Sequence, residues 1–312
     1  MASESAGSRG GVDTREADAD APVHPRNSLN DLSGREWIKA TKSWLVCDSR
    51  RYHQNRDTEL HPARYPEELV AQFLRFFTKQ GAWVLDPFCG SGATLVAARE
   101  EGRNGVGVEV SARYAAMSRE RLAPLARELG GDARIVRADA REVADAHTWR
   151  GLEAMPVGAD GLPRFDFIMT SPPYWNMLRT SRGGVESTHK LRAKDGLDTD
   201  YGDEPGNLGL ITDYEDFIEA LGEVFDGCAT LLAPEKYLVI VAQNVRVPEG
   251  HVRPLAWDLA ERVSRTLSFQ GERIWCQDSK RLGIWGYPTT FVPNYHHHYC
   301  LIFRNIRTGD GR

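Results

Sequence analysis

The sequence predicts an α/β protein with a doubly wound, mostly parallel sheet of about seven strands. From Ala82 onwards, short apolar runs alternate with amphipathic helical patterns, the order that parallel strands with crossover helices require. One run, Tyr237–Ala242, is apolar almost throughout, as expected for a strand covered on both faces. A chain of 312 residues is long enough for one large domain of this kind with appendages.

The N-terminal part of the chain predicts a tail followed by a helix. Residues 1–26 contain almost no large apolar side chains, so we expect a disordered tail and then a single domain over 27–312. Ser33 and Glu36 form a capping-box pattern, in which each side chain accepts a hydrogen bond from the backbone of the other residue. Apolar residues at helical spacing follow as far as Leu45 and predict a helix over this stretch.

The remaining elements follow from similar patterns. A second helix is predicted from Pro66, because proline suits the first position of a helix, and Phe73 and Phe77 lie on its apolar face. The predicted strands are residues 82–85, 105–109, 134–139, 165–170, 237–242, 272–276 and 298–303. The predicted helices between them are residues 92–101, 111–129, 213–232 and 254–267.

The composition predicts a cytoplasmic globular protein. With 41% hydrophobic and 27% charged residues, the chain resembles ordinary soluble domains. No apolar run approaches the roughly 20 residues that span a membrane, and the N-terminus lacks a signal-peptide pattern, so we expect no membrane partner. The net charge of −5 means that a nucleic-acid partner requires a local basic face.

Cysteine and histidine usage predicts no metal site. The five cysteines are scattered without a C-x-x-C pair, which fits reduced thiols and argues against a zinc site. His296, His297 and His298 are consecutive and lie close to Cys300. Adjacent residues of a strand point to opposite faces of the sheet, so these side chains cannot all bind one ion.

A glycine-rich segment follows the predicted strand 82–85. It runs Asp86-Pro-Phe-Cys-Gly-Ser-Gly-Ala-Thr94, and it lies between a strand and a helix. Gly90 and Gly92 allow a sharp turn and a close approach of the backbone to a ligand. No Gly-Lys-Ser/Thr sequence follows, so this segment is not a nucleotide-binding Walker loop.

Acidic residues end three successive predicted strands. Asp86 follows the first, Glu109 ends the second, and Asp139 ends the third. Ligands of open α/β sheets bind at these carboxyl ends, where Glu109 can accept hydrogen bonds from a ribose and Asp139 from an adenine amine. Either residue alone could be a surface carboxylate, but the three together favour a ligand that contains a nucleoside.

The segment Ser171-Pro172-Pro173-Tyr174 ends the predicted strand 165–170. Each proline fixes φ and lacks an N–H donor, so neither a strand nor a helix continues here, and a rigid turn results. The turn presents a hydroxyl, a carbonyl without a ladder partner and an aromatic ring. Such a set suits a flat group with an exocyclic amine, although an ordinary proline-rich loop is the alternative interpretation.

Together, the segments Asp86–Thr94 and Ser171–Tyr174 closely resemble motifs of the S-adenosylmethionine-dependent DNA amino-methyltransferases. The resemblance implies a Rossmann-like methyltransferase fold and S-adenosylmethionine as the cofactor. It implies that the cofactor is bound by Asp86, Phe88, Gly90, Gly92, Thr94, Glu109 and Asp139. It further implies that Ser171, Pro172, Pro173 and Tyr174 are the catalytic residues.

The resemblance also implies double-stranded DNA as the partner, with the target base flipped into the site. Serine at position 171 is similar to enzymes that methylate the N4 amine of cytosine, whereas N6-adenine enzymes more often have Asp or Asn there. Here the glycine-rich motif precedes the Pro-Pro motif, the reverse of many Ser-Pro-Pro-Tyr members, so the order does not decide the subclass. N6-adenine methylation, RNA methylation and an inactive DNA-binding subunit are the alternatives. The resemblance also implies a bacterial cytoplasmic protein associated with the nucleoid, with a cognate restriction endonuclease as a further candidate partner.

Two segments are predicted to contact DNA. The insertion 175–212 is polar, and its basic first half includes Arg179, Arg182, Lys190 and Arg192. A flexible, solvated loop is the alternative there. The second segment, Gln277–His298, mixes cations with aromatic residues.

Overall fold

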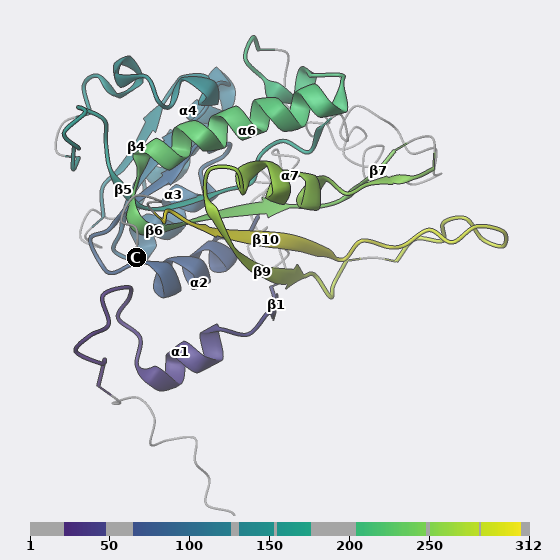
Figure 1. Ribbon diagram of the computed structural model, residues 1–312, viewed down its shortest axis with the longest axis horizontal. Coiled ribbons are helices and arrows are strands. Elements are labelled where there is room, and N and C mark those ends of the chain that lie inside the picture. The colour runs from purple at the N-terminus through teal and green to yellow at the C-terminus, as the bar shows by residue number, and fades with distance from the viewer. Residues whose placement is uncertain are drawn as a thin grey trace, which may run out of the picture.

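The computed structural model describes residues 22–47, 65–125, 131–152, 155–175, 204–247, 250–280 and 282–306. Figure 1 shows a central sheet with helices packed against it. The predicted DNA contacts Arg179, Arg182, Lys190 and Arg192 lie outside the described residues, as do residues 1–21 of the predicted tail.

The main sheet has the order β1-β9-β10-β6-β5-β2-β3-β4. Its strands are β1 (Trp44–Val46), β2 (Trp83–Asp86), β3 (Asn104–Val108), β4 (Ala133–Val136), β5 (Phe165–Thr170), β6 (Leu232–Ala242), β9 (Ser268–Cys276) and β10 (His297–Arg304). Neighbouring strands pair in parallel except that β10 is antiparallel to both β6 and β9. The short strands β7 (Val245–Arg246) and β8 (Val252–Arg253) form a separate antiparallel hairpin. The structure therefore confirms the doubly wound, mostly parallel sheet.

Helices connect these strands. The α-helices are α1 (Gly34–Ala40), α2 (Glu67–Phe77), α3 (Ala93–Glu100), α4 (Ala112–Leu122), α6 (Tyr214–Leu231) and α7 (Leu255–Val263). Three short 3-10 helices are η4 (Ala140–Glu142), η5 (Ala146–Trp149) and η7 (Leu208–Leu210). Within the described ranges, every helix is too short or too polar to cross a bilayer.

Alternate residues of β5 show how the two faces of the sheet are covered. Phe167 and Met169 are fully buried in one core cluster, together with residues of α2 and α3. Ile168, between them, belongs to a second cluster that contains the apolar residues of α6 and α7. Because successive side chains of a strand point to opposite faces, β5 is buried on both sides, as its nearly continuous apolar sequence predicts.

The main sheet has eight strands rather than seven, because the N-terminal segment adds β1. The predicted helix up to Leu45 is wrong, since α1 ends at Ala40 and β1 pairs in parallel with β9. Leu45 is buried whereas its neighbours Trp44 and Val46 are exposed, which is the two-residue period of a strand at the edge of a sheet. The capping box of Ser33 is confirmed at the start of α1.

The described structure also begins before the predicted boundary at residue 27. Val23 forms an antiparallel bridge with Ser33. The side chain of Asn27 accepts hydrogen bonds from the backbone of Leu29 and Asn30, both at 3.1 Å, and closes a turn. Val23 is therefore tied to the residue that caps α1, although the side chains of residues 22–26 are exposed. Their composition hides this, because the bridge is made by backbone groups.

Candidate functional site

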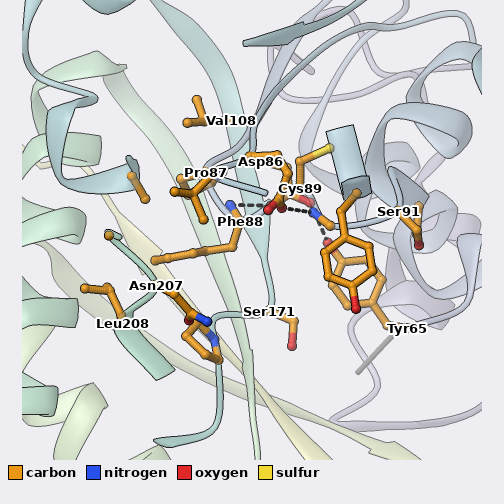
Figure 2. A pocket seen from close by; sticks show the side chains of 18 residues that line it. Tyr65, Asp86, Pro87, Phe88, Cys89, Ser91, Val108, Ser171, Asn207 and Leu208 are labelled. Carbon is orange, nitrogen blue, oxygen red and sulfur yellow. Dashed lines mark hydrogen bonds between the residues drawn. The ribbon is translucent and has the colours of Figure 1, made fainter. Parts of the chain in front are cut away.

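A pocket lies at the carboxyl ends of β2, β3 and β5. In Figure 2, Tyr65 and Ser91 lie on one side of it, Asn207 and Leu208 lie on the other, and Ser171 lies between them. The empty space between these walls, counted with its open mouth, is about 790 Å³. The position of the pocket follows the rule for ligands of open α/β sheets.

Asp86, the last residue of β2, forms a buried hydrogen-bond cluster at the base of the pocket. Its carboxylate accepts from the hydroxyls of Tyr65 at 3.0 Å, Thr94 at 2.5 Å and Thr170 at 2.6 Å. The backbone N–H of Phe88 donates to it at 3.1 Å. The carboxylate thus joins the segment before α2, the start of α3 and the end of β5.

Burial raises the pKa of Asp86, and the hydrogen bonds from Thr170, Thr94, Phe88 and Tyr65 oppose that rise. A buried carboxylate with this many donors is well satisfied, because each oxygen can accept more than one hydrogen bond. Burial and the nearby Asp86 charge raise the pKa of the Tyr65 phenol well above its usual value, so this hydroxyl remains a donor.

Glu109 follows β3 directly and is 9% exposed. Its carboxylate accepts hydrogen bonds from the backbone N–H groups of Gly90 at 2.7 Å and Ser111 at 2.8 Å. Burial, together with the nearby charges of Asp86 and Glu204, raises the pKa of Glu109 to about 7, although these two hydrogen bonds lower it. Glu109 lines the pocket, and its carboxylate oxygens have further lone pairs, so it can accept hydrogen bonds from hydroxyl groups of a ligand.

The glycine-rich loop turns sharply into α3 through two glycines with positive φ. Gly90 has φ +52° and Gly92 has φ +82°, a region that other residues rarely adopt. Gly92 is the N-cap of α3, and its N–H donates to the carbonyl of Cys89 at 2.9 Å. A Cβ atom at Gly92 would lie 2.1 Å from Oγ of Ser118 on α4.

Replacing Gly92 by alanine is expected to lower the free energy of unfolding by about 2–4 kcal/mol, because left-handed strain and the clash with Ser118 add. Denaturant unfolding of both variants measures this loss. Gly34→Ala is the matched control, since nothing lies within 4 Å of a Cβ at that position. The double variant Gly92→Ala/Ser118→Ala is expected to recover part of the loss; a Gly92→Ala protein as stable as the wild type would contradict the expectation.

The Pro-Pro turn is fastened by hydrogen bonds of Tyr174. Its hydroxyl lies 3.0 Å from Oγ of Ser171 and 3.4 Å from the carbonyl of Val241 on β6. The Tyr174 side chain is only 5% exposed, and burial raises the pKa of its phenol. Trp175 follows with φ +46°, a conformation that is uncommon for a large residue and is typical of functional turns. Ser171 and Pro173 line the pocket.

The histidine triplet packs on different partners. The ring of His298 stacks on Trp275 with centroids 4.6 Å apart and lies 6.1 Å from the ring of Tyr174. Burial lowers the pKa of His298 to about 3, so this ring is neutral. His297 instead lies 3.2 Å from the hydroxyl of Tyr299. In the part of the chain that the structure describes, no three metal-binding side chains gather at one point.

The structure brings together Asp86, Phe88, Gly90, Glu109 and Ser171 in the walls of the pocket. Other predicted residues support this wall from outside it, namely Gly92, Thr94, Pro172 and Tyr174. Asp139 does not line the pocket. Its carboxylate is bonded to the guanidinium of Arg141 and lies against Gly206, which does line it.

Sequence reasoning missed two sets of residues. Tyr65 and Thr170 bind Asp86, but hydroxyl residues at such positions carry no signal of their own. The segment Gly206–Leu208 lines the pocket although it lies near the end of the insertion 175–212, which was predicted to contact DNA. The short pattern Gly-Asn-Leu-Gly could have indicated a turn there, since Asn207 accepts from the N–H of Gly209 at 2.9 Å and caps η7.

Comparison with known proteins matches residues 20–120 to the N6/N4 DNA methylase family. The type II methyltransferase M2.DpnII of Streptococcus pneumoniae is 40% identical over 62 residues, which is 20% of this chain and 23% of that protein. The type II methyltransferase M.BglI of Bacillus subtilis is 34% identical over 93 residues, 30% of this chain and 26% of that protein. The matched stretches therefore span about a quarter of these relatives.

Among solved structures, TrmN from Thermus thermophilus is similar with a TM-score of 0.43 and 15% identity, over 76% of this chain and 47% of that chain. The family match contains Asp86 and Glu109, and it ends before β5, which supplies Thr170 to the cluster of Asp86. Residues 20–120 of this chain are therefore similar to the N6/N4 DNA methylase family.

Proposed function

We propose that this protein transfers a methyl group from S-adenosylmethionine to the exocyclic N4 amine of a cytosine in double-stranded DNA. One observation carries the proposal: the glycine-rich loop, Glu109 and Ser171 line the same pocket. This arrangement supports binding of a nucleoside cofactor beside a turn that suits an amine. The known relatives match only part of this chain, so activity and substrate remain proposals.

The pocket residues fit S-adenosylmethionine. Glu109 suits the ribose hydroxyls, and the backbone at Gly90 allows a close approach of the methionine part. Phe88 and Val110 provide an apolar wall for a flat base, next to Asn207. When it is bound, S-adenosylmethionine supplies a methyl group on a sulfonium centre.

The hydrogen bonds around Ser171 leave its oxygen free to accept. Tyr174 has one hydroxyl hydrogen, and donation of this hydrogen to the carbonyl of Val241 leaves its oxygen as an acceptor. Ser171 then donates to Tyr174 at 3.0 Å, and both lone pairs of its Oγ remain available. An amine hydrogen of the target base is a suitable partner for them.

Acceptors at this position assist methyl transfer to an amine. The lone pair of an exocyclic amine is delocalised into the ring, so the amine is a weak nucleophile. Hydrogen bonds to Ser171 Oγ and the Pro172 carbonyl favour a pyramidal nitrogen and stabilise the positive charge that develops on it. The rigid turn holds the nitrogen in line with the donor, which supplies much of the rate without a covalent enzyme intermediate.

The proposal is tested by incubating the protein with S-adenosylmethionine and PCR-amplified genomic DNA, followed by digestion to nucleosides and mass spectrometry. N4-methylcytosine supports the assignment from Ser171. N6-methyladenine keeps the fold and the chemistry but contradicts the choice of base. Neither product with cofactor bound favours RNA as the substrate, and no cofactor binding in calorimetry favours an inactive DNA-binding subunit. A cognate restriction endonuclease remains a prediction.

Cofactor affinity is expected to rise about tenfold between pH 6 and pH 8, because the ribose requires the carboxylate form of Glu109 and its pKa is about 7. Calorimetric titration at both pH values measures this rise. Because the pKa of Glu109 is raised in the folded apoprotein, protonation of this residue stabilises the folded state. That stabilisation is lost as the pH rises through the raised pKa, so the stability of the apoprotein falls while cofactor affinity rises. Glu109→Gln is the control, with weaker affinity and a flat profile; an unchanged slope in this variant would assign the titration elsewhere.

A further inference from the structure

The connection between β9 and β10 forms an extended arm, residues 277–296, which projects away from the sheet in Figure 1. Hydrogen bonds tie its two sides together. The N–H of Gln277 donates to the carbonyl of His296 at 2.7 Å, and Nζ of Lys280 donates to the carbonyl of Tyr295 at 2.7 Å. Further out, the N–H of Gly283 donates to the side chain of Asn294 at 2.8 Å. The arm therefore has a defined internal structure.

Large apolar side chains of this arm face solvent. Ile284 is 87% exposed, Phe291 86%, Tyr287 83% and Leu282 78%. Single exposed apolar residues are normal on protein surfaces, but four on one projecting segment indicate a contact with a partner.

The charge of the arm indicates what that partner is. The arm has two cations, Lys280 and Arg281, against one acid, Asp278, whereas the whole chain has a net charge of −5. The position of Arg281 lies outside the described residues. A segment of net positive charge on an acidic protein fits a polyanion.

The arm starts at the edge of the sheet that holds the pocket. Because β10 is antiparallel to β6, its first residues lie beside the carboxyl end of β6, where Tyr299 pairs with Ala242. His298, two residues beyond the arm, contacts the ring of Tyr174. The base of the arm therefore lies beside the Pro-Pro turn, and the exposed apolar residues extend outward from there.

We propose that the arm inserts its exposed apolar side chains between base pairs of duplex DNA, next to the target base. This inference rests on the proposed function and deepens it. Apolar wedges that enter a base step unstack it and bend the duplex, and a flipped base leaves a gap that such a wedge can fill. Phosphate contacts alone would not require four exposed apolar residues, whereas insertion into the stack does.

The test uses the full chain and begins with the wild type. Methylation of PCR-amplified genomic DNA, followed by sequencing of the modified positions, gives the target site. A labelled 30-base-pair duplex with that site is then titrated by fluorescence anisotropy with wild type and Ile284→Ser/Phe291→Ser. Ile38→Ser is the matched control, since Ile38 is 75% exposed on α1, far from the arm in Figure 1.

The double variant is expected to bind the duplex about 10-fold or more weakly, with cofactor affinity and melting temperature unchanged. The dependence of affinity on salt is expected to keep its slope, because no cation is removed, whereas a phosphate contact would change it by about 1. The control is expected to bind like the wild type.

Three outcomes overturn the proposal, and they can be told apart. A wild type that binds cofactor but methylates no DNA overturns the proposed function together with the DNA arm. A wild type that methylates DNA, with the double variant equally tight, overturns the arm alone. A wild-type dimer that becomes a monomer on double substitution, at unchanged DNA affinity, assigns the arm to a second copy of the chain.

Discussion

Asp86→Ala is expected to lower the free energy of unfolding by about 3–5 kcal/mol, the largest loss expected from any single change in this pocket. The carboxylate accepts four hydrogen bonds at the base of the pocket, and its removal leaves buried donors without an acceptor. Tyr65 and Thr94 lie close enough for one hydroxyl to donate to the other, so the second of these hydroxyls, the hydroxyl of Thr170 and the N–H of Phe88 are left without an acceptor. Urea unfolding of the apoprotein measures the loss.

Two variants separate the network from the charge. Asp86→Asn keeps the shape and one acceptor oxygen, and it is expected to lose less stability than Asp86→Ala. Thr170→Val removes one of the four donors at nearly constant volume and is expected to cost about 1–2 kcal/mol. An Asp86→Ala protein with wild-type stability would show that the cluster contributes nothing to the fold.

Ser171→Ala is expected to lower the rate of methyl transfer about 10²–10³-fold, the size of effect seen when one preorganised polar group is removed from a reacting centre. Ser171 lines the pocket, and its hydroxyl is the polar side chain that begins the Pro-Pro turn. Cofactor affinity is expected to stay within about threefold, because the cofactor residues are untouched. Single-turnover transfer of a labelled methyl group to PCR-amplified DNA measures the rate.

Tyr174→Phe is the companion variant for Ser171. It keeps the ring but removes the hydroxyl that lies 3.0 Å from Ser171, so the serine can rotate. We expect a decrease of about 10-fold in the same rate, since orientation and not the acceptor is lost. Full activity of Ser171→Ala, with cofactor bound as in the wild type, would remove the serine from the mechanism.

Local sequence predicts the central sheet well because its strands are buried on both faces. Phe165–Thr170 is almost continuously apolar, and its observed bounds equal the predicted ones. The prediction of a helix up to Leu45 was wrong because only one side chain of β1 is buried. A single buried residue between two exposed apolar neighbours does not distinguish a strand from the end of a helix. Edge strands are decided by their partner, in this case β9, which lies more than 200 residues away.

In the site, too, features set by local sequence were predictable, whereas contacts between distant segments were not. The positions of Asp86, Glu109 and Ser171 at strand ends were predictable, since parallel strands share one carboxyl edge. The partners of Asp86 were not, because Tyr65 and Thr170 reach it from segments 21 and 84 residues away and look like ordinary polar residues. Gly206 lines the pocket from within the insertion 175–212, whose length leaves unspecified where the chain returns to the site.

The order of strands in the sheet has a consequence for the order in which the two motifs can occur in the sequence. The strands β2, β3 and β4 form one half of the sheet, and β5, β6, β10, β9 and β1 form the other. Within the sheet, the halves meet along a single seam between β2 and β5, where Val84 and Leu85 pair with Phe167 and Ile168. Both motifs lie beside this seam and face each other across it. Their contacts depend on pairing across the seam and not on the order of the two motifs in the chain, so a rearrangement that places β5 before β2 in the sequence would preserve the site.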